Sequence, residues 1–160
     1  MPQIIKGIAA SDGIGIAKAY TLTEPDLSFE KKQIDDPVAE YQRIEDAFNQ
    51  SISELAAIKQ NAKRRLSDEE LEVFDAHIAI LSDPEMKNQI KDEIENQHIS
   101  AEEAMTDVTT NFANVLAAMT DNKYMQERAA DVKDVAKRAL SHLLGKQLPD
   151  IASISEPVVI

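Results

Sequence analysis

The sequence predicts a mainly α-helical protein, in which an antiparallel helical bundle is inserted into an incomplete α/β subdomain represented by short N- and C-terminal strands. Two observations carry this prediction. Apolar residues recur at steps of three and four through most of residues 36–145, which is the period of amphipathic helices. Glycine and aromatic residues are scarce, with 4 Gly, no Trp and 4% aromatics, which disfavours a long β-sandwich.

The first 22 residues have a strand-like pattern rather than a helical one. Apolar and small residues fill positions 4–10 and 14–20, and Ser11, Asp12 and Gly13 between them form a turn signal. We therefore expect two short strands in residues 1–22, belonging to the α/β subdomain.

A long helix is expected to begin at Asp36 and Pro37, because Asp is a favoured N-cap and Pro a favoured first helical residue. The helix is expected to end near Arg65. Its apolar stripe consists of Val38, Tyr41, Ile44, Phe48, Ile52, Leu55 and Ile58.

Four further helices follow from their start and stop signals. Capping boxes are predicted at residues 67–70 and 100–103, where a serine is followed three positions later by a glutamate. Asp83 with Pro84 starts the third helix, and Gly145 is placed to end the last one. These signals predict a helical subdomain over residues 36–145.

The end of the sequence returns to a strand pattern. A breaker at residues 148–150 is followed by Pro157, Val158, Val159 and Ile160. We interpret residues 148–160 as the return into the α/β subdomain, and the apolar strand at the last residue leads us to expect that the chain is a fragment.

Composition excludes several classes of function. The chain has no Cys, so disulfide, thiolate and zinc–thiolate chemistry are absent. A net charge of −12 repels phosphate backbones, so nucleic acid is not expected as a partner. There is no secretory signal pattern and no apolar run long enough for a membrane span, so we expect a cytoplasmic protein with no membrane partner.

No catalytic or metal-binding residue is predicted from local spacing. No His-x-x-x-His pair occurs, and most acids lie at helix starts or on polar faces. His98 and His142 lie near helix C-termini, where a structural role is expected. The glycines at positions 13 and 15 lack the following Lys-Ser/Thr of a phosphate-binding loop.

The second helix carries a second apolar stripe, formed by Val73, Ala76, His77 and Ile80. This stripe is either core between neighbouring helices or an exposed patch for a partner. Its acidic surroundings favour the patch, which we expect to be largely exposed and suited to a partner with an apolar centre and a basic rim. The surrounding acids are Asp68, Glu69, Glu72, Asp83 and Glu85.

Three runs of residues together resemble enzyme I of the bacterial phosphoenolpyruvate-dependent sugar phosphotransferase system. They are GIAASDGI at 7–14, FDAHIAILSDP at 74–84 and ERAADVKD at 127–134. The resemblance covers the whole chain. It implies a helical subdomain that binds the histidine-containing phosphocarrier protein, inserted into an α/β subdomain that carries a phosphorylated histidine.

In that family the phosphorylated histidine lies in a Gly-Gly-x-Thr-Ser-His motif, which does not occur here. A separate C-terminal barrel binds phosphoenolpyruvate and magnesium and makes the full-length protein a homodimer. The resemblance therefore implies an N-terminal fragment with no catalytic residue and no cofactor of its own, which should not accept phosphate from phosphoenolpyruvate.

The resemblance also assigns residues to the docking of the phosphocarrier. They are Asp68, Glu69, Val73, Ala76, His77, Ile80, Asp83, Glu85 and Met86, with Arg128 and Asp131 on the last helix. Glu72 joins them as a member of the acidic rim. By residue spacing alone, Arg128 and Asp131 can also pair with each other. The alternative function is a helical adaptor or scaffold that binds a basic protein and takes no part in phosphoryl transfer.

Overall fold

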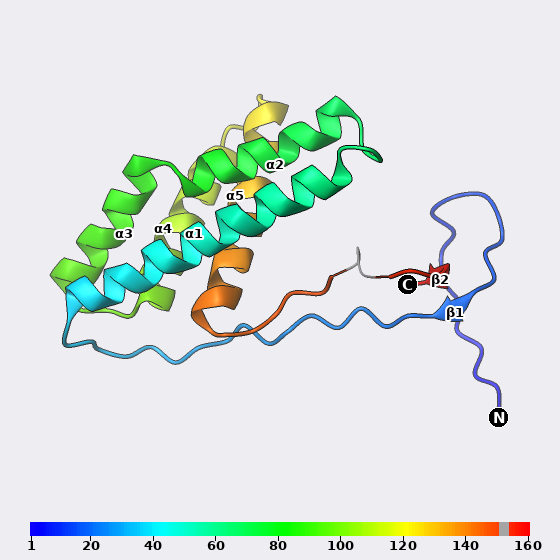
Figure 1. The fold of residues 1–160 in the computed structure, drawn as a ribbon, viewed down its shortest axis with the longest axis horizontal. Helices are drawn as coiled ribbons and strands as arrows, with labels where there is room; N and C mark the ends of the chain where they lie inside the picture. The colour runs from blue at the N-terminus through cyan, green and yellow to red at the C-terminus, as the bar shows by residue number, and fades with distance from the viewer. Residues whose placement is uncertain (151–153) are drawn as a thin grey trace. The chain divides into compact units, whose positions relative to one another are not determined.

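The computed structural model describes residues 1–150 and 154–160, which form two units. Residues 25–148 make a helical unit, and residues 1–24 with 149–160 make a second, smaller one (Figure 1). The predicted return segment 148–160 includes residues 151–153, which lie outside the described part of the chain.

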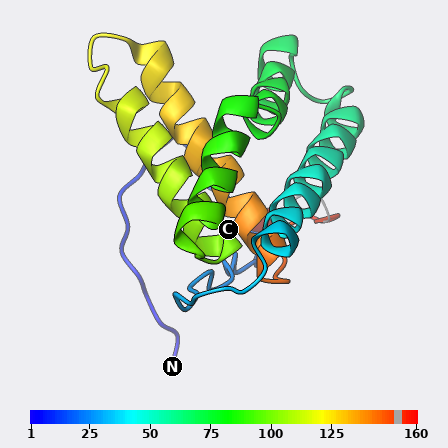
Figure 2. The same ribbon diagram turned by 90° about the vertical axis from the view of Figure 1, so that its left-hand side faces the viewer.

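Five α-helices build the helical unit, as the sequence predicted. Their bounds are α1 Pro37–Ala62, α2 Asp68–Leu81, α3 Pro84–Gln97, α4 Ala101–Ala117 and α5 Lys123–Leu143. Helices α1 and α2 run antiparallel on one side, the α4–α5 hairpin lies on the other, and α3 lies between them (Figure 2). None of the helices in the described residues is both long and apolar enough to cross a membrane.

The predicted helix starts are confirmed by their capping bonds. The Asp36 carboxylate accepts a hydrogen bond from the backbone N–H of Ala39 at 3.1 Å, and Pro37 is the first helical residue. Ser67 and Glu70 form a complete capping box. Local side-chain chemistry thus fixes where these helices begin.

The second predicted capping box is formed only in part. Ser100 accepts from the backbone N–H of Glu103 at 3.3 Å, but Glu103 makes an ion pair with Lys31 at 3.4 Å instead of the return bond to Ser100. The N-terminus of α4 gains a different partner, because the Glu40 carboxylate accepts from the N–H of Ala101 at 2.8 Å. A carboxylate from another helix therefore satisfies a backbone N–H at the start of α4, where the sequence motif predicted a carboxylate from α4 itself.

Gly145 ends α5 as predicted. Its φ of +65° lies in the left-handed region that favours glycine. The N–H of Gly145 donates to the carbonyl of His142 at 3.1 Å, and the N–H of Lys146 donates to the carbonyl of Ser141 at 2.8 Å. These two bonds are a Schellman motif, which satisfies carbonyls left over at the helix end.

The core lies where all five helices meet. Phe48 and Ile44 of α1, Ile90 of α3 and Val135 of α5 are almost completely buried and belong to one continuous apolar cluster. Val38, although on the predicted stripe of α1, is 77% exposed.

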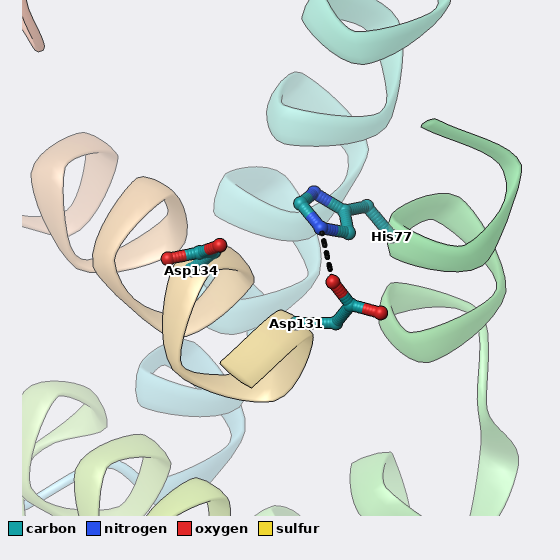
Figure 3. A group of neighbouring side chains, drawn as sticks. All are labelled: His77, Asp131 and Asp134. Carbon is teal, nitrogen blue, oxygen red and sulfur yellow. Dashed lines mark hydrogen bonds and ion pairs between the residues drawn. The ribbon is translucent and has the colours of Figure 1, made fainter. Parts of the chain in front are cut away.

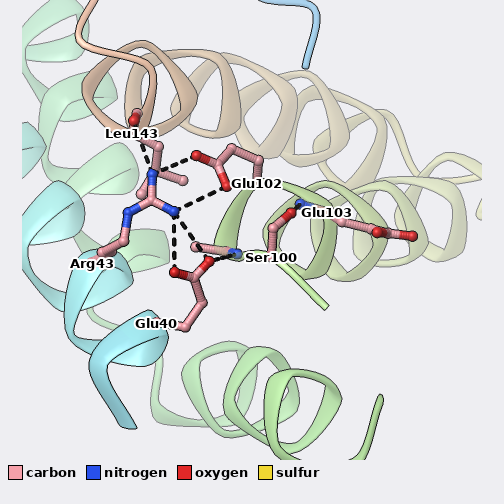
Figure 4. Close-up of polar contacts among 7 residues, drawn as sticks. Glu40, Arg43, Ser100, Glu102, Glu103 and Leu143 are labelled. Carbon is pink, nitrogen blue, oxygen red and sulfur yellow. Dashed lines mark hydrogen bonds and ion pairs between the residues drawn. The ribbon is translucent and has the colours of Figure 1, made fainter. Parts of the chain in front are cut away.

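A polar network joins three helices at one end of the bundle (Figure 4). The Arg43 guanidinium of α1 donates to both carboxylate oxygens of Glu102, at 2.5 and 3.2 Å, and to the carbonyl of Leu143 at 3.1 Å. It also pairs with Glu40 at 3.1 Å. No local pattern in the sequence identifies this network, since Arg43 and Leu143 alone are 100 residues apart.

The charges of the network suit the helix ends that they meet. Two carboxylates lie at the N-terminus of α4, and the guanidinium lies at the C-terminus of α5, so both complement the helix dipoles. Burial acts to raise the pKa of Glu102, but the hydrogen bonds and charge of Arg43 outweigh it and hold this pKa below its usual value. The hydrogen bond to Glu102 raises the pKa of Arg43, so the guanidinium stays charged.

The described residues of the smaller unit contain one short pair of strands. Strand β1 (Lys18–Ala19) runs parallel to β2 (Val158–Val159), with Lys18 opposite Val158. The prediction of a strand at residues 4–10 is wrong, and the strand predicted at 14–20 is limited to two residues. The reason is that strands need neighbours, and a single two-stranded pair is at best marginally stable.

Glu93 of α3 is the one acid in the described residues whose buried oxygen, Oε2, has no hydrogen-bond partner. Partial burial, with Asp107 and Glu103 nearby, raises its pKa above the ordinary value of 4.5. We expect Glu93→Gln to raise the free energy of unfolding at pH 7 by roughly 0.5–1 kcal/mol, a modest gain because part of the side chain stays in solvent.

The gain in stability from Glu93→Gln should be larger at neutral pH than at acidic pH. A carboxyl with a raised folded-state pKa destabilises the protein above that pKa, and the penalty vanishes as the pH falls below the unfolded value. Chemical denaturation at pH 7 and pH 4 should therefore show the gain only at pH 7. The matched control is Glu95→Gln, at an exposed position on the same helix, where the contact with Lys91 is a surface pair at 3.9 Å. An equal gain from both variants would contradict this account of Glu93.

Candidate functional site

The face of α2 that carries the second apolar stripe is only partly exposed. Val73 is 47% exposed, and Ala76 and His77 are half-buried. Ile80 is 8% exposed, so the prediction of a largely exposed stripe is wrong at this residue. The reason is that α2 contacts both α1 and α5, which turns the C-terminal end of the stripe into core.

Met86 is also placed in the core, at 1% exposure in the first turn of α3. It offers almost no surface to a partner in this structure. Asp83 is half-buried and accepts from the backbone N–H of Glu85 at 2.8 Å, so it also caps α3. The remaining members of the acidic rim are exposed on α2 and α3, namely Asp68, Glu69, Glu72 and Glu85.

A hydrogen bond connects this face to α5 (Figure 3). The imidazole Nε2 of His77 lies 3.1 Å from Oδ1 of Asp131. The expected contact between Asp131 and Arg128 is replaced by this one, and the Arg128 guanidinium lies over the ring of Tyr124, 6.0 Å from its centroid. The structure thus brings His77 and Asp131, 54 residues apart, into one site.

Helix α2 is also held from its other side. The Lys59 ammonium of α1 contacts both carboxylate oxygens of Asp75, at 2.6 and 2.7 Å. Contacts with α1 on one side and α5 on the other fix the position of α2. The face that carries Val73 and His77 is therefore held in one orientation.

A third side chain completes a possible metal-ligand set with His77 and Asp131. One carboxylate oxygen of Asp134 lies within 4.8 Å of the other two ligand atoms. No local spacing pattern identifies this ligand set, because its side chains come from two different helices, α2 and α5. Asp131 and Asp134 are i,i+3 neighbours, which was the one signal in the sequence.

The two other histidines are engaged in structural contacts. His142 lies 3.0 Å from a carboxylate oxygen of Glu54, which also pairs with Arg138 at 3.0 Å. His98 caps α3 with a left-handed φ of 51°, and its carbonyl accepts from the N–H of Ile34 at 2.8 Å.

Known proteins are similar in sequence to this chain over its whole length. The chain is 51% identical to a phosphoenolpyruvate-protein phosphotransferase of Enterococcus faecalis, and 49% identical to one of Priestia megaterium. Each alignment covers 100% of this chain and 28% of the relative. The chain therefore spans less than a third of the length of these curated relatives.

Solved structures agree with the fold. An NMR structure described as Enzyme I (nEIt) matches with a TM-score of 0.87 at 30% identity, over 98% of this chain and 63% of that one. The N-terminal domain of Enzyme 1 – Nitrogen matches with a TM-score of 0.69 at 27% identity, over 81% of this chain and 54% of that one.

Residues 6–128 also match the sequence profile of the family described as PEP-utilising enzyme, N-terminal. This match covers most of the chain, including the first four helices and the start of α5. The chain belongs to the family of PEP-utilising enzymes and corresponds to their N-terminal domain, of the kind found in enzyme I.

Proposed function

We propose that this chain is the part of a phosphoenolpyruvate-protein phosphotransferase that docks the histidine-containing phosphocarrier protein. Phosphate would pass to the carrier from a phosphohistidine that is not among these 160 residues, in the service of sugar uptake. The names of the relatives support the reaction, and the resemblance to enzyme I supports the carrier and the role in sugar transport.

One observation carries the proposal for the docking site. Val73 is an exposed apolar residue beside the exposed acids Glu69 and Glu72, on a helix fixed by contacts on both sides. An apolar centre with a charged rim is the usual anatomy of a transient protein interface. The chain's net charge of −12 adds a long-range attraction for a basic partner.

The structure changes how the docking residues should divide their roles. We expect Val73, Ala76 and His77 to touch the partner, because they are at least partly exposed, and we expect the buried Ile80 and Met86 to support them from the core. His77 would act as a contact residue and not as a phosphate acceptor, since its Nε2 is already bonded to Asp131. His77→Gln should therefore weaken docking without abolishing transfer in a full-length enzyme.

Magnesium and dimerisation belong, by the resemblance, to a barrel outside this chain, and a cytoplasmic location is proposed on the same ground. The ligand set of His77, Asp131 and Asp134 does not suit magnesium, which prefers six oxygen ligands in an octahedron.

Glu69→Lys is expected to slow association with the phosphocarrier by about 10-fold at low salt and to flatten its salt dependence. Rim charges act mainly on the association rate, and their effect is screened by salt. Stopped-flow or surface-binding kinetics at two salt concentrations measure this. Glu95→Lys, at an exposed position near the C-terminal end of α3, makes the same charge change away from the proposed face and should have a much smaller effect.

The same measurement separates docking from the alternative of an adaptor for basic proteins. Lysozyme, a basic protein with no part in phosphoryl transfer, serves as the comparison partner. Specific docking predicts that Glu69→Lys affects the phosphocarrier far more than it affects lysozyme. Equal sensitivity of both partners to Glu69→Lys and Glu95→Lys would leave only non-specific charge attraction and refute the proposed site.

A further inference from the structure

The group formed by His77, Asp131 and Asp134 has a chemistry that docking does not use. Its three ligand atoms, one imidazole nitrogen and two carboxylate oxygens, all lie within 4.8 Å of one another (Figure 3). They come from two helices that pack together, His77 from α2 and the two aspartates from successive turns of α5.

The group is more than a cluster of exposed acids. The side chain of His77 is 14% exposed and that of Asp131 is 23% exposed, and their mutual hydrogen bond holds both in place. Asp134 is exposed, and one of its carboxylate oxygens lies within 4.8 Å of the other two ligand atoms. His77 and Asp131 are thus preorganised as ligands, and Asp134 would complete the site from the solvent side.

We infer that His77, Asp131 and Asp134 form a binding site for a single divalent ion of borderline softness, with Zn²⁺ as the best match. Zn²⁺ binds imidazole and carboxylate at about 2.0–2.2 Å, so two ligands of a tetrahedral site lie about 3.3 Å apart. The 3.1 Å between His77 Nε2 and Asp131 Oδ1 is close to that separation. Three protein ligands leave a fourth position for water.

Metal binding replaces the hydrogen bond between the two side chains. The ion needs an unprotonated Nε2, so it selects the neutral tautomer of His77 that carries its proton on Nδ1. The carboxylate of Asp131 then binds the ion instead of accepting a hydrogen bond.

Occupancy would also change the proposed docking face, and this consequence rests on the proposed function. His77 and Asp131 belong to that face, and a bound ion would engage both and add two positive charges among the acids. Zn²⁺ should therefore weaken the docking of a basic partner.

The site itself is tested without any partner. The intact chain is titrated with Zn²⁺ against a chromophoric chelator, and thermal unfolding is followed with and without the ion. We expect one ion per chain, a higher unfolding midpoint with Zn²⁺, and no such shift with Mg²⁺. His77→Ala and Asp134→Asn should each lower the Zn²⁺ affinity at least about 10-fold.

Two control variants make the result specific. Asp121→Asn removes an exposed acid elsewhere, and His98→Asn removes another imidazole while keeping a residue that tolerates the left-handed backbone. Both should bind Zn²⁺ like the original chain. Asp134→Asn is the variant least able to disturb folding, because Asp134 is exposed. Unchanged affinity in Asp134→Asn and His77→Ala would overturn the site.

The consequence for docking is tested by measuring phosphocarrier binding with and without Zn²⁺ at a concentration that fills the site. We expect weaker binding to the original chain and no change with Asp134→Asn, which also controls for Zn²⁺ bound to the carrier. If Zn²⁺ does not change phosphocarrier binding to the original chain, the proposed effect on docking is refuted, but the Zn²⁺ site itself is not. A carrier that never binds, with or without Zn²⁺, would refute the proposed function and this consequence together.

Discussion

Arg43→Met is expected to lower the free energy of unfolding by about 2–4 kcal/mol. Removing one partner of a buried ion pair leaves the other charge uncompensated, which typically costs about 3–5 kcal/mol. The expectation here is lower because the Arg43 side chain is 38% exposed, although that of Glu102 is only 9% exposed. Urea denaturation at pH 7 measures the loss.

The pH dependence of this loss follows from the lowered pKa of Glu102. A carboxyl whose pKa is lowered in the folded state stabilises the protein at pH values above its unfolded-state pKa of about 4.5. This contribution disappears as the pH falls through the folded-state pKa. The gap between Arg43→Met and the original chain should therefore be widest near pH 7 and narrow below about pH 4.

A second substitution provides the matched control. Combining Arg43→Met with Glu102→Leu removes both charges of this pair, and it should recover part of the stability because the Glu102 carboxylate is then no longer buried without its cation. Glu40 loses its ion pair with Arg43 in both variants, so this loss does not contribute to the difference between them. If the double variant is as unstable as the sum of the two single variants, Arg43 and Glu102 do not act as a pair.

Val73→Asp is expected to weaken binding of the phosphocarrier at least about 10-fold without changing the unfolding midpoint appreciably. Val73 is the exposed apolar centre of the proposed face, and a charge there must be desolvated when the partner binds. Val115→Asp on α4 is the control, since Val115 is 62% exposed on a helix away from α2. Isothermal titration calorimetry measures the affinity, and circular dichroism measures the midpoint.

Equal affinities in Val73→Asp and Val115→Asp would exclude Val73 from the interface. A large drop in the midpoint of Val73→Asp alone would instead mean that this position is part of the core, as is the case for Ile80.

The helices were predictable because their signals are local. Asp36 with Pro37, Ser67 with Glu70, and Asp83 with Pro84 each bring a capping oxygen to a backbone N–H within three residues. The strands were poorly predicted for the opposite reason. Whether residues 4–10 form a strand depends on a hydrogen-bonding neighbour elsewhere in the chain, which no local pattern reveals.

The candidate site was predictable only in part. The stripe of α2 and its acids follow from helical periodicity, and Val73 is exposed as expected. The burial of Ile80 depends on how α1 and α5 pack against α2, and the periodicity of one helix does not contain that information. The contact of Asp131 with His77 rather than Arg128 has the same origin.

The most direct test of the proposed docking face is to map it by NMR. The isotope-labelled chain is titrated with unlabelled phosphocarrier, and the shifts of its backbone amides are followed. We predict that the largest changes fall on residues 68–80 of α2 and 128–131 of α5, around Val73 and His77. Largest changes on α3 and α4 instead, or no saturable change at all, would contradict the account.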